Sequence, residues 1–491
     1  MDIIVSAVWF TIALATITVV IMTKVARRRT KVDTVCHRPP PPTVNGGAAI
    51  GVLYTFLTRG LRVMIHDQYE KFGSVFTISL FGQKVTFLVG PEVSAHFFQG
   101  PDSEISHGNM LEFTVPIIGK EVGYGVDSTT RKEQYSFFFD ALKPPKLRSH
   151  IGPMLQEVEN YFSNWGQQGL VDLKHEMEQL LMLISGRCLI GKEVHEMIFN
   201  EFFTLFHKLT ENSFGLTSMF FPYAPTSANR RRDIARAELS KLLTEIIRLR
   251  KISNTDEKDL LQNLIDSKYR DGRPTTEVEV TAMIISIIFA GKHISSISST
   301  WTGACLLHHK RWLAAATEEQ ELIIRKYGDH IDYSILQEMD ILHRCVKEVL
   351  RLHPPSPMFF RKVHKSFNIR SKEGEEFEIP SGHTLVSPVL FNCSIPYIYK
   401  DPDVYDPDRF GPGREEDKVG GKFSYTPFSG GRHTCPGEAF AYMEMKVIWS
   451  HLLRNFELSL VSPFPRTNWM KIIPDLQGKV MVSYKRRSRT T

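Results

Sequence analysis

The stretch that decides the fold is Phe428-Ser-Gly-Gly-Arg-His-Thr-Cys435-Pro-Gly437. It places one cysteine in a glycine-rich loop, and the run that follows, from Glu438 to Trp449, reads as a long helix. A thiolate at the N-terminus of a helix is stabilised by the helix dipole and by backbone N–H groups. Cys435 is therefore predicted to act as a thiolate ligand.

A thiolate held in this way is the axial ligand that pushes electron density onto haem iron and favours cleavage of the O–O bond. The glycines allow the backbone to pass close to a flat macrocycle, because side chains there would collide with it. The spacing F-x-x-G-x-[RH]-x-C-x-G from Phe428 to Gly437 predicts a haem-thiolate loop, with Cys435 as the metal ligand.

Three further motifs stand elsewhere in the chain: Ala290-Gly291-Lys-His293-Ile294-Ser295, Glu348-Val-Leu-Arg351 and Pro407-Asp-Arg409-Phe410. Taken alone, Glu348 and Arg351 are an ordinary i, i+3 helix pair, and most such pairs are weak surface salt bridges. Together with the cysteine loop, and in this order, the motifs resemble those of the cytochrome P450 superfamily.

The resemblance implies a mainly α-helical fold with a small β-sheet subdomain and haem b as the cofactor. It implies that the ion pair of Glu348 and Arg351, joined by Arg409, locks the helix beneath the haem. It also implies that oxygen binds at a kink in the long central helix, with Gly291, His293 and Ser295 as catalytic residues.

Length and composition agree with a large globular body. The 491 residues are 42% hydrophobic and 23% charged, and the net charge of +6 is modest. A size prior suggests about three domains, but the main body shows no internal linker or repeat, so we expect one haem-thiolate monooxygenase domain at 46–484. The six cysteines have no paired spacing such as C-x-x-C, which favours a reducing compartment with a single functional thiolate.

The local patterns predict a small sheet, then helices, then strands again. Two β-rich runs, 74–82 and 83–89, meet at a glycine and predict a hairpin. Helical patterns dominate from about 91 to 351, and the apolar run at 276–307, interrupted by Gly291, predicts a core helix with a weak point. Strand-like pieces return at 363–389.

The N-terminus is predicted to be a membrane anchor at 1–23. Residues 3–22 carry no charge over 20 positions, about the length that spans a bilayer. Basic residues follow at once, so the positive-inside rule leaves the body in the cytosol. A cleaved signal peptide would carry its charges before the apolar run. We expect a basic, proline-rich hinge at 24–45, a single-pass protein of the endoplasmic-reticulum membrane facing the cytosol, and a basic tail at 485–491.

Longer phrases point to a subfamily. The segments 222–237, 405–418 and 451–465, together with His433, resemble plant sterol 14α-demethylases. Carried over by position, this resemblance implies that the haem propionates are held by basic or imidazole donors, namely Arg131, Lys132, Arg361 and His433. Charge-assisted hydrogen bonds suit two buried carboxylates.

The chain departs from the demethylase pattern above the haem. Leu111 replaces a tyrosine, Ile118 a phenylalanine, Gly125 an aspartate and Ile294 a threonine of the oxygen segment. Loss of an aromatic wall and of polar groups reshapes an apolar pocket. The substrate cavity is predicted to be lined by Leu111, Phe113, Ile118, Tyr124, Met358 and Phe359.

These departures favour a triterpenoid such as β-amyrin as the substrate, hydroxylated or epoxidised with O2. The chain then resembles the grass-specific branch of the demethylase family that includes the oat β-amyrin oxidase. Two alternatives stay open: a sterol 14α-demethylase acting on obtusifoliol, and a haem protein that does not activate oxygen. Because the chain has no dinucleotide or flavin fingerprint of its own, electrons are expected from NADPH–cytochrome P450 reductase. Membrane lipid is a further expected partner, and nucleic acid is not.

Overall fold

The computed structural model describes residues 38–80, 82–108, 111–139, 142–211, 221–253, 259–469 and 473–488. The predicted anchor at 1–23, most of the predicted hinge at 24–45 and the end of the tail at 485–491 lie outside the described residues. The chain divides into two compact units. Unit 1 is Met1–Ser106 with Phe359–Phe391, and unit 2 is His107–Met358 with Asn392–Thr491.

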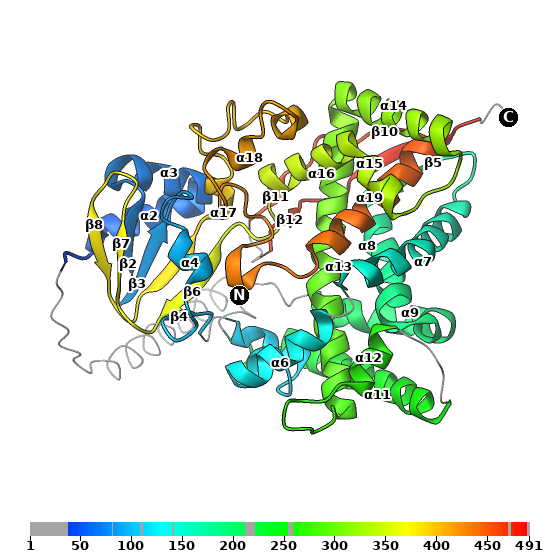
Figure 1. The fold of residues 1–491 in the computed structure, drawn as a ribbon, viewed down its shortest axis with the longest axis horizontal. Helices are drawn as coiled ribbons and strands as arrows, with labels where there is room; N and C mark the ends of the chain where they lie inside the picture. Colours follow the sequence, from blue (N-terminus) through cyan, green and yellow to red (C-terminus); the bar gives the residue numbers. More distant parts are fainter. Residues whose placement is uncertain are drawn as a thin grey trace, which may run out of the picture. The chain divides into compact units, whose positions relative to one another are not determined.

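Unit 1 is built on a six-stranded sheet with the order β1-β2-β3-β9-β6-β4 (Figure 1). Strands β2 and β3 pair antiparallel from Val75 opposite Leu88 to Leu80 opposite Gln83, which confirms the predicted hairpin. Gly82 in the turn has a φ of 74°, which glycine adopts without steric cost. The strands are β1 (Thr43–Val44), β2 (Val75–Leu80), β3 (Gln83–Leu88), β4 (Ile105–Ser106), β6 (Phe359–Val363) and β9 (Thr384–Ser387).

The rest of unit 1 is three helices and a small hairpin. The helices are α2 (Gly46–Arg59), α3 (Leu61–Phe72) and α4 (Ala95–Gln99), the hairpin strands are β7 (Phe367–Arg370) and β8 (Glu376–Ile379), and α17 (Val389–Asn392) crosses the boundary between the units. Inside the six-stranded sheet, Thr86 Oγ1 lies 2.9 Å from Thr77 Oγ1 and 2.9 Å from His383 Nδ1, and all three residues are buried. This polar ladder ties neighbouring strands together.

Unit 2 holds most of the helices, as predicted for the region from 91 to 351. Its helical elements are η1 (Glu112–Thr114), α5 (Val115–Ile118), η2 (Gly123–Gly125), α6 (Ser128–Phe139), α7 (Pro144–Ser163), α8 (Leu173–Ser185), η4 (Gly186–Ile190), α9 (Lys192–Thr210), α11 (Ser227–Ser253), α12 (Leu260–Asp266), α13 (Glu277–His308), α14 (Lys310–Tyr327), α15 (Tyr333–Glu338), α16 (Asp340–Leu352), η5 (Pro407–Phe410), α18 (Glu416–Val419), η6 (Gly431–His433) and α19 (Glu438–Asn455). Two small antiparallel sheets complete it: β5 (Gln168–Asp172), β10 (Phe456–Leu460) and β13 (Met481–Arg486) in one, β11 (Thr467–Asn468) and β12 (Asp475–Leu476) in the other.

The central element of unit 2 is α13, a helix of 32 residues (Figure 1). A capping box starts it, because the Thr276 hydroxyl accepts from Glu279 N and the Glu279 carboxylate accepts from Thr276 N. The helix runs without a break through Gly291, where the sequence predicted a weak point. Among the described residues it is the one helix long and apolar enough to cross a membrane, but 67% of its apolar window is buried inside the protein. It is therefore the core helix that the sequence predicted.

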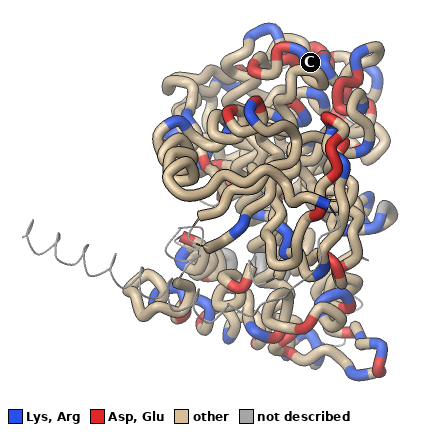
Figure 2. Tube along the Cα trace, turned by 90° about the vertical axis from the view of Figure 1, so that its left-hand side faces the viewer, with Lys and Arg blue, Asp and Glu red and all other residues tan. Residues whose placement is uncertain are grey.

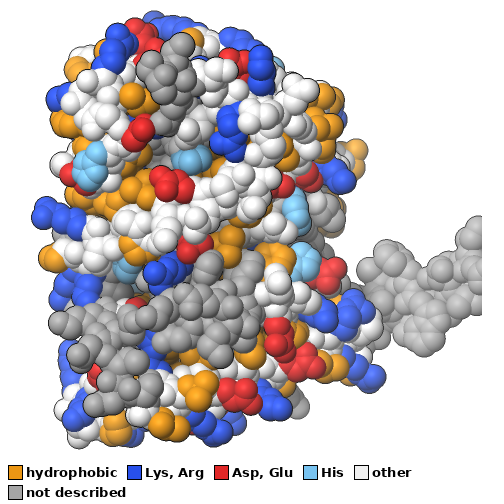
Figure 3. Space-filling view, turned by 90° about the vertical axis from the view of Figure 1, so that its right-hand side faces the viewer, with side chains coloured by type: hydrophobic (Ala, Val, Ile, Leu, Met, Phe, Trp, Pro, Cys, Tyr) orange, Lys and Arg blue, Asp and Glu red, His pale blue; other side chains and the backbone are white. Residues whose placement is uncertain are grey.

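Charged residues of both signs occur over much of the described chain. Lys and Arg are interspersed with Asp and Glu over the trace (Figure 2). On the face drawn in Figure 3, basic, acidic and apolar side chains also alternate. The modest net charge is therefore not gathered into one basic stripe on the surface shown there.

Candidate functional site

The cysteine loop precedes α19 in unit 2 and is folded back on itself. Cys435 N donates to Phe428 O at 2.9 Å, and Ser429 and Gly431 both have positive φ, 63° and 61°. Non-glycine residues adopt that left-handed conformation rarely. The turn places Cys435 three residues before the first residue of α19, as the sequence pattern predicts.

Phe428 anchors this loop to two helices. Its ring lies 5.2 Å from that of Tyr442 and packs on a small core formed by Val346 and Leu350 of α16 with Met445 of α19. The first residue of the loop motif therefore has a packing role. It couples the cysteine loop to the helix that carries the E-x-x-R motif.

Cys435 differs from the other described cysteines in its surroundings. It is exposed, whereas Cys188, Cys305, Cys345 and Cys393 are buried. Burial raises the pKa of Cys345 to about 12 and that of Cys393 to about 11, so these thiols stay protonated. Partial desolvation also raises the pKa of Cys435, and the backbone N–H groups of Gly437 and Glu438 act in the opposite direction. An accessible sulfur with N–H donors beside it fits the axial ligand of a haem.

Two of the four predicted propionate-binding residues, Arg131 and His433, belong to one cluster of side chains in unit 2. The Arg131 guanidinium lies 4.8 Å from the centre of the Tyr124 ring. The His107 ring lies 5.6 Å from that of Tyr124 and 5.0 Å from that of His433. Tyr124, predicted to line the substrate cavity, thus belongs to the cluster of cationic and imidazole side chains that suits carboxylate groups.

Of the other two members of that predicted set, Lys132 belongs to unit 2 and Arg361 to unit 1. Lys132 is exposed on α6, one residue after Arg131. Arg361 lies on β6 of unit 1, is buried, and holds its guanidinium 5.0 Å from the Phe97 ring. Sequence reasoning missed His107, because no motif surrounds it and its contacts join residues far apart in the chain.

The predicted oxygen segment of α13 presents a small-residue surface. Ala290 and Gly291 are exposed, and no atom lies within 4 Å of the position that a Cβ on Gly291 would take. His293 and Ile294 are half-buried. Ser295 is buried, and its hydroxyl donates to Glu444 Oε2 of α19 at 3.1 Å. Glu444 is a further residue that the sequence did not single out.

The residues predicted to line the substrate cavity lie on different elements and belong to both units. Phe113 and Ile118 are buried in the main hydrophobic core of unit 2, and Leu111 packs against that core. Met358 is half-buried at the end of a segment of unit 2, and Phe359 is half-buried on β6 of unit 1.

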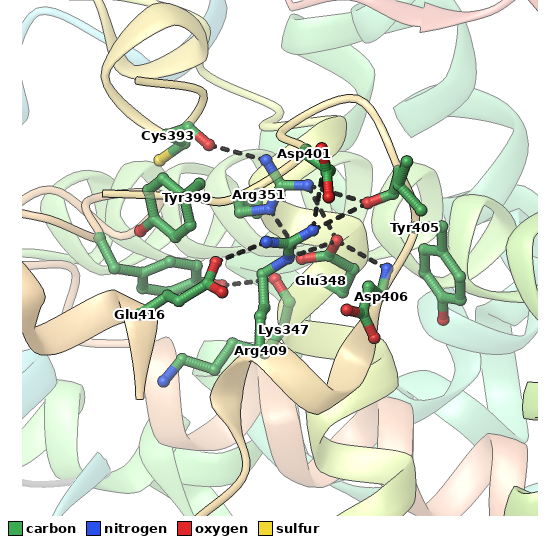
Figure 4. A network of polar contacts seen from close by, with 12 residues as sticks. Lys347, Glu348, Arg351, Cys393, Tyr399, Asp401, Tyr405, Asp406, Arg409 and Glu416 are labelled. Atoms are coloured by element: carbon green, nitrogen blue, oxygen red, sulfur yellow. Dashed lines mark hydrogen bonds and ion pairs between the residues drawn. The ribbon is translucent and has the colours of Figure 1, made fainter. Parts of the chain in front are cut away.

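The E-x-x-R motif forms a buried polar network with the P-x-R-F segment (Figure 4). Glu348 Oε2 lies 2.7 Å from Arg351 Nε, and Glu348 Oε1 lies 2.9 Å from Arg409 Nε. All three side chains are at most 1% exposed. Glu348 Oε1 also accepts from the backbone N–H of Asp406 at 3.0 Å. Each oxygen of this carboxylate thus has a charge-assisted guanidinium partner, which offsets the cost of burying the charges.

Each arginine also fixes a loop. Arg351 Nη1 donates to Cys393 O at 2.9 Å, and Arg409 Nη2 donates to Val404 O at 3.0 Å (Figure 4). Arg409 Nη1 lies 2.5 Å from the carboxylate of Glu416, a partner that sequence reasoning missed. The network thus ties α16 to the segment that runs from Cys393 to α18.

Comparisons with known proteins identify the family of the chain. Residues 39–480 match the cytochrome P450 family. The obtusifoliol 14-alpha demethylase of Sorghum bicolor is 52% identical, over 91% of this chain and 90% of the relative. The sterol 14-demethylase of Arabidopsis thaliana is 50% identical over 93% of each chain. The solved structure "Retinoic acid bound cyanobacterial CYP120A1" has a TM-score of 0.78 at 23% identity, covers 92% of this chain and 100% of that chain, and shows the shared fold.

The leading functional interpretation of the sequence, a hydroxylase or epoxidase of a triterpenoid such as β-amyrin, is wrong. The similar proteins are named sterol 14-demethylases, which favours the alternative. The interpretation gave too much weight to a few departures from the family pattern. Ile118 is buried core, where its side chain packs against other apolar residues, and a Cβ on Gly125 would collide with the backbone of Lys120. Local packing thus accounts for both residues without a change of substrate.

The alternative of a haem protein that does not activate oxygen gains no support from relatives named as demethylases. Enzymes of this family are haem-b monooxygenases that take electrons from a redox partner, and the accessible thiol of Cys435 fits their cofactor. The chain therefore belongs to the cytochrome P450 family and, within it, is similar to the plant sterol 14-demethylases over most of its length.

Proposed function

We propose that this protein is a sterol 14α-demethylase that oxidatively removes the 14-methyl group of obtusifoliol or a closely related sterol. The observation that carries the proposal is the identity of 50% and 52% to two obtusifoliol 14-alpha demethylases over at least nine-tenths of each chain. Substrate pockets depend on residues spread over many elements, so likeness over the whole chain outweighs a handful of local differences.

The residues of this chain have separable roles in the proposed reaction. The bound haem supplies the chemistry that activates O2 and inserts oxygen into a C–H bond. Cys435 would ligate the iron, and Arg131, Lys132, Arg361 and His433 would hold the propionates. Gly291 and His293 would border the oxygen side, where a small residue leaves room close to the α13 backbone.

We assign NADPH–cytochrome P450 reductase as the electron donor, docking at a cleft beside the cysteine loop. This cleft of unit 2 has a volume of about 860 Å³ and is lined by Cys435, Pro436, Tyr442 and several lysines. Lys418 and Lys422 are exposed at its edge, where Lys418 also pairs with Glu415, and Lys347 is paired with Asp417 at 2.5 Å. Exposed ammonium groups beside the haem ligand suit an acidic partner surface.

We place the protein at the endoplasmic-reticulum membrane, held by residues 3–22 with the body in the cytosol. One feature of unit 1 supports a membrane location. Helix α2 begins eight residues into the described chain and exposes Ile50, Tyr54 and Leu57 at 61%, 68% and 68%. Because these residues recur every three to four positions, they form an apolar stripe on one side of the helix. Such a stripe suits a lipid interface close to the proposed anchor.

A binding titration tests the substrate assignment without the reductase. Full-length holoenzyme in lipid nanodiscs is titrated with obtusifoliol, and the absorbance of the haem is followed. The proposal predicts a saturable spectral change with obtusifoliol and a much weaker one with β-amyrin. A holoenzyme that binds carbon monoxide normally yet shows no saturable change with obtusifoliol would contradict it.

A further inference from the structure

One buried hydrogen bond joins the two helices that border the candidate haem site. Ser295 Oγ of α13 donates to Glu444 Oε2 of α19 at 3.1 Å. Ser295 lies one turn beyond Gly291 on nearly the same side of α13, and α19 starts just after the cysteine loop. The bond therefore links the predicted oxygen segment to the helix that follows the thiolate.

Glu444 has surroundings that are unusual for a carboxyl group. Glu444 is 2% exposed, and among the described residues its carboxyl group accepts a hydrogen bond from the Ser295 hydroxyl. Burial raises the pKa of Glu444 to about 8, and the bond from Ser295 opposes the rise. At neutral pH the group is therefore mainly the uncharged acid, which avoids the large cost of an unpaired buried charge. Its side chain acts there as a polar tether.

A second link between the same two helices lies one turn further from Gly291. Trp449 Nε1 of α19 donates to the Ser299 hydroxyl at 3.1 Å and to its carbonyl at 3.2 Å. At Gly303 the helices approach so closely that an added Cβ would collide with the Trp449 ring. Residues 295, 299 and 303 thus form an i, i+4, i+8 row along α13 that faces α19. Glu444 contacts Ser295, which is the member of this row nearest the oxygen segment.

We propose that Glu444 is a positioning residue for the oxygen segment of α13. Through Ser295 it holds the turn that contains Gly291 at a set distance from α19, and so from the backbone N–H groups beside Cys435. In a helix the Ser295 N–H bonds the carbonyl of Gly291, so a fixed Ser295 also fixes that carbonyl. The inference rests on the haem-thiolate class of the enzyme and is independent of which sterol it binds.

The test compares Glu444→Gln, Glu444→Leu and Ser295→Ala, each as full-length holoenzyme. Glutamine keeps an acceptor oxygen of the same reach, whereas leucine and alanine break the bond. Ser299→Ala is the matched control, because it removes a buried hydroxyl one turn away and leaves the Ser299 carbonyl to accept from Trp449. The primary readout is the set of ferric EPR g-values, and the second is the amount of product formed per NADPH consumed.

We expect Glu444→Leu and Ser295→Ala to shift or broaden the EPR signal and to lower product per NADPH by about threefold or more. Glu444→Gln and Ser299→Ala are expected to keep the wild-type signal. A wild-type signal in Glu444→Leu would overturn the inference. So would a Glu444→Gln enzyme that behaves like Glu444→Leu, because the acidic proton would then matter rather than the tether. Since the EPR signal is read without substrate, a wrong sterol assignment leaves this test intact.

Discussion

The carboxylate of Glu348 lies 2.7 Å from Nε of Arg351, one turn further along α16, and neither side chain is exposed to solvent. The same carboxylate reaches Arg409 at 2.9 Å on its other oxygen. In water such an i, i+3 pair contributes little. Here the pair is buried, and each guanidinium also donates to backbone carbonyls. Removing one of the charged side chains would therefore leave a buried charge with fewer counter-charges and a carbonyl without its donor.

Arg409→Leu is therefore expected to lower the free energy of unfolding by about 3–5 kcal/mol, because it leaves both Glu348 and Glu416 without one cation. Urea unfolding of the holoenzyme and the yield of haem-loaded protein measure the loss. Lys326→Ala is the control, since Lys326 pairs with Glu338 at the surface and should give a wild-type curve. Equal stability of the two variants would show that the buried network is dispensable.

The close contact between α13 and α19 makes a second prediction. A Cβ on Gly303 would collide with the Trp449 ring and with Leu173 Cδ2 of α8. Gly303→Ala should therefore destabilise the protein by about 1–3 kcal/mol through overpacking. In contrast, Gly51→Ala, at an exposed interior position of α2 where an added Cβ meets no atom outside its own helix segment within 4 Å, should stabilise by about 0.5–1 kcal/mol through helix propensity. Thermal unfolding of both variants checks the opposite signs.

His383 in the sheet of unit 1 gives a pH prediction. Burial, helped by Lys84 and Lys362, lowers the pKa of His383 to about 4 from an ordinary 6.5. The folded protein then binds fewer protons than the unfolded chain, so this residue costs stability as pH falls from about 6.5 towards 4. His383→Asn should be less stable than wild type at pH 8, with a difference in Tm that narrows by pH 5. A constant difference in Tm between those pH values would argue against a neutral buried imidazole.

The lysines beside the cysteine loop predict an effect on electron transfer. Lys418→Glu with Lys422→Glu should raise the KM for NADPH–cytochrome P450 reductase at low salt about fivefold or more, through lost electrostatic steering. High salt should shrink the difference, because screening weakens it. Lys241→Glu, on an exposed position of α11, is the charge-matched control. An equal rise in KM in the control would point to net charge and not to this cleft.

The sequence predicted best those elements whose hydrogen bonds join residues that are close together in the chain. The hairpin of β2 and β3, the core helix α13 and the loop before α19 follow from local patterns, because their hydrogen bonds join residues close in the chain. The six-stranded sheet joins β3 to β9, which lies almost 300 positions further on, and no local pattern specifies such a pairing.

In the candidate site, too, the sequence identified residues in local motifs but not residues placed by contacts between distant parts of the chain. Cys435, Glu348 and Arg409 stand in spaced motifs and were identified, whereas His107 and Glu444 owe their positions to tertiary contacts. Substrate class was the weakest inference, because it depended on which side chains face a cavity. Ile118, for example, packs within the main hydrophobic core of unit 2. Which side chains face a cavity depends on tertiary packing, and it cannot be read directly from a single sequence.

The activity proposed for this protein is the removal of the 14-methyl group from a sterol. The most direct measurement is product analysis by mass spectrometry after co-expression with a plant reductase in yeast, with obtusifoliol supplied to one culture and β-amyrin to another. Cys435→Ala, which removes the proposed iron ligand, is the negative control. The account predicts loss of the 14-methyl group from obtusifoliol in the wild-type culture and unchanged β-amyrin. Unchanged obtusifoliol alongside an oxygenated β-amyrin would contradict it.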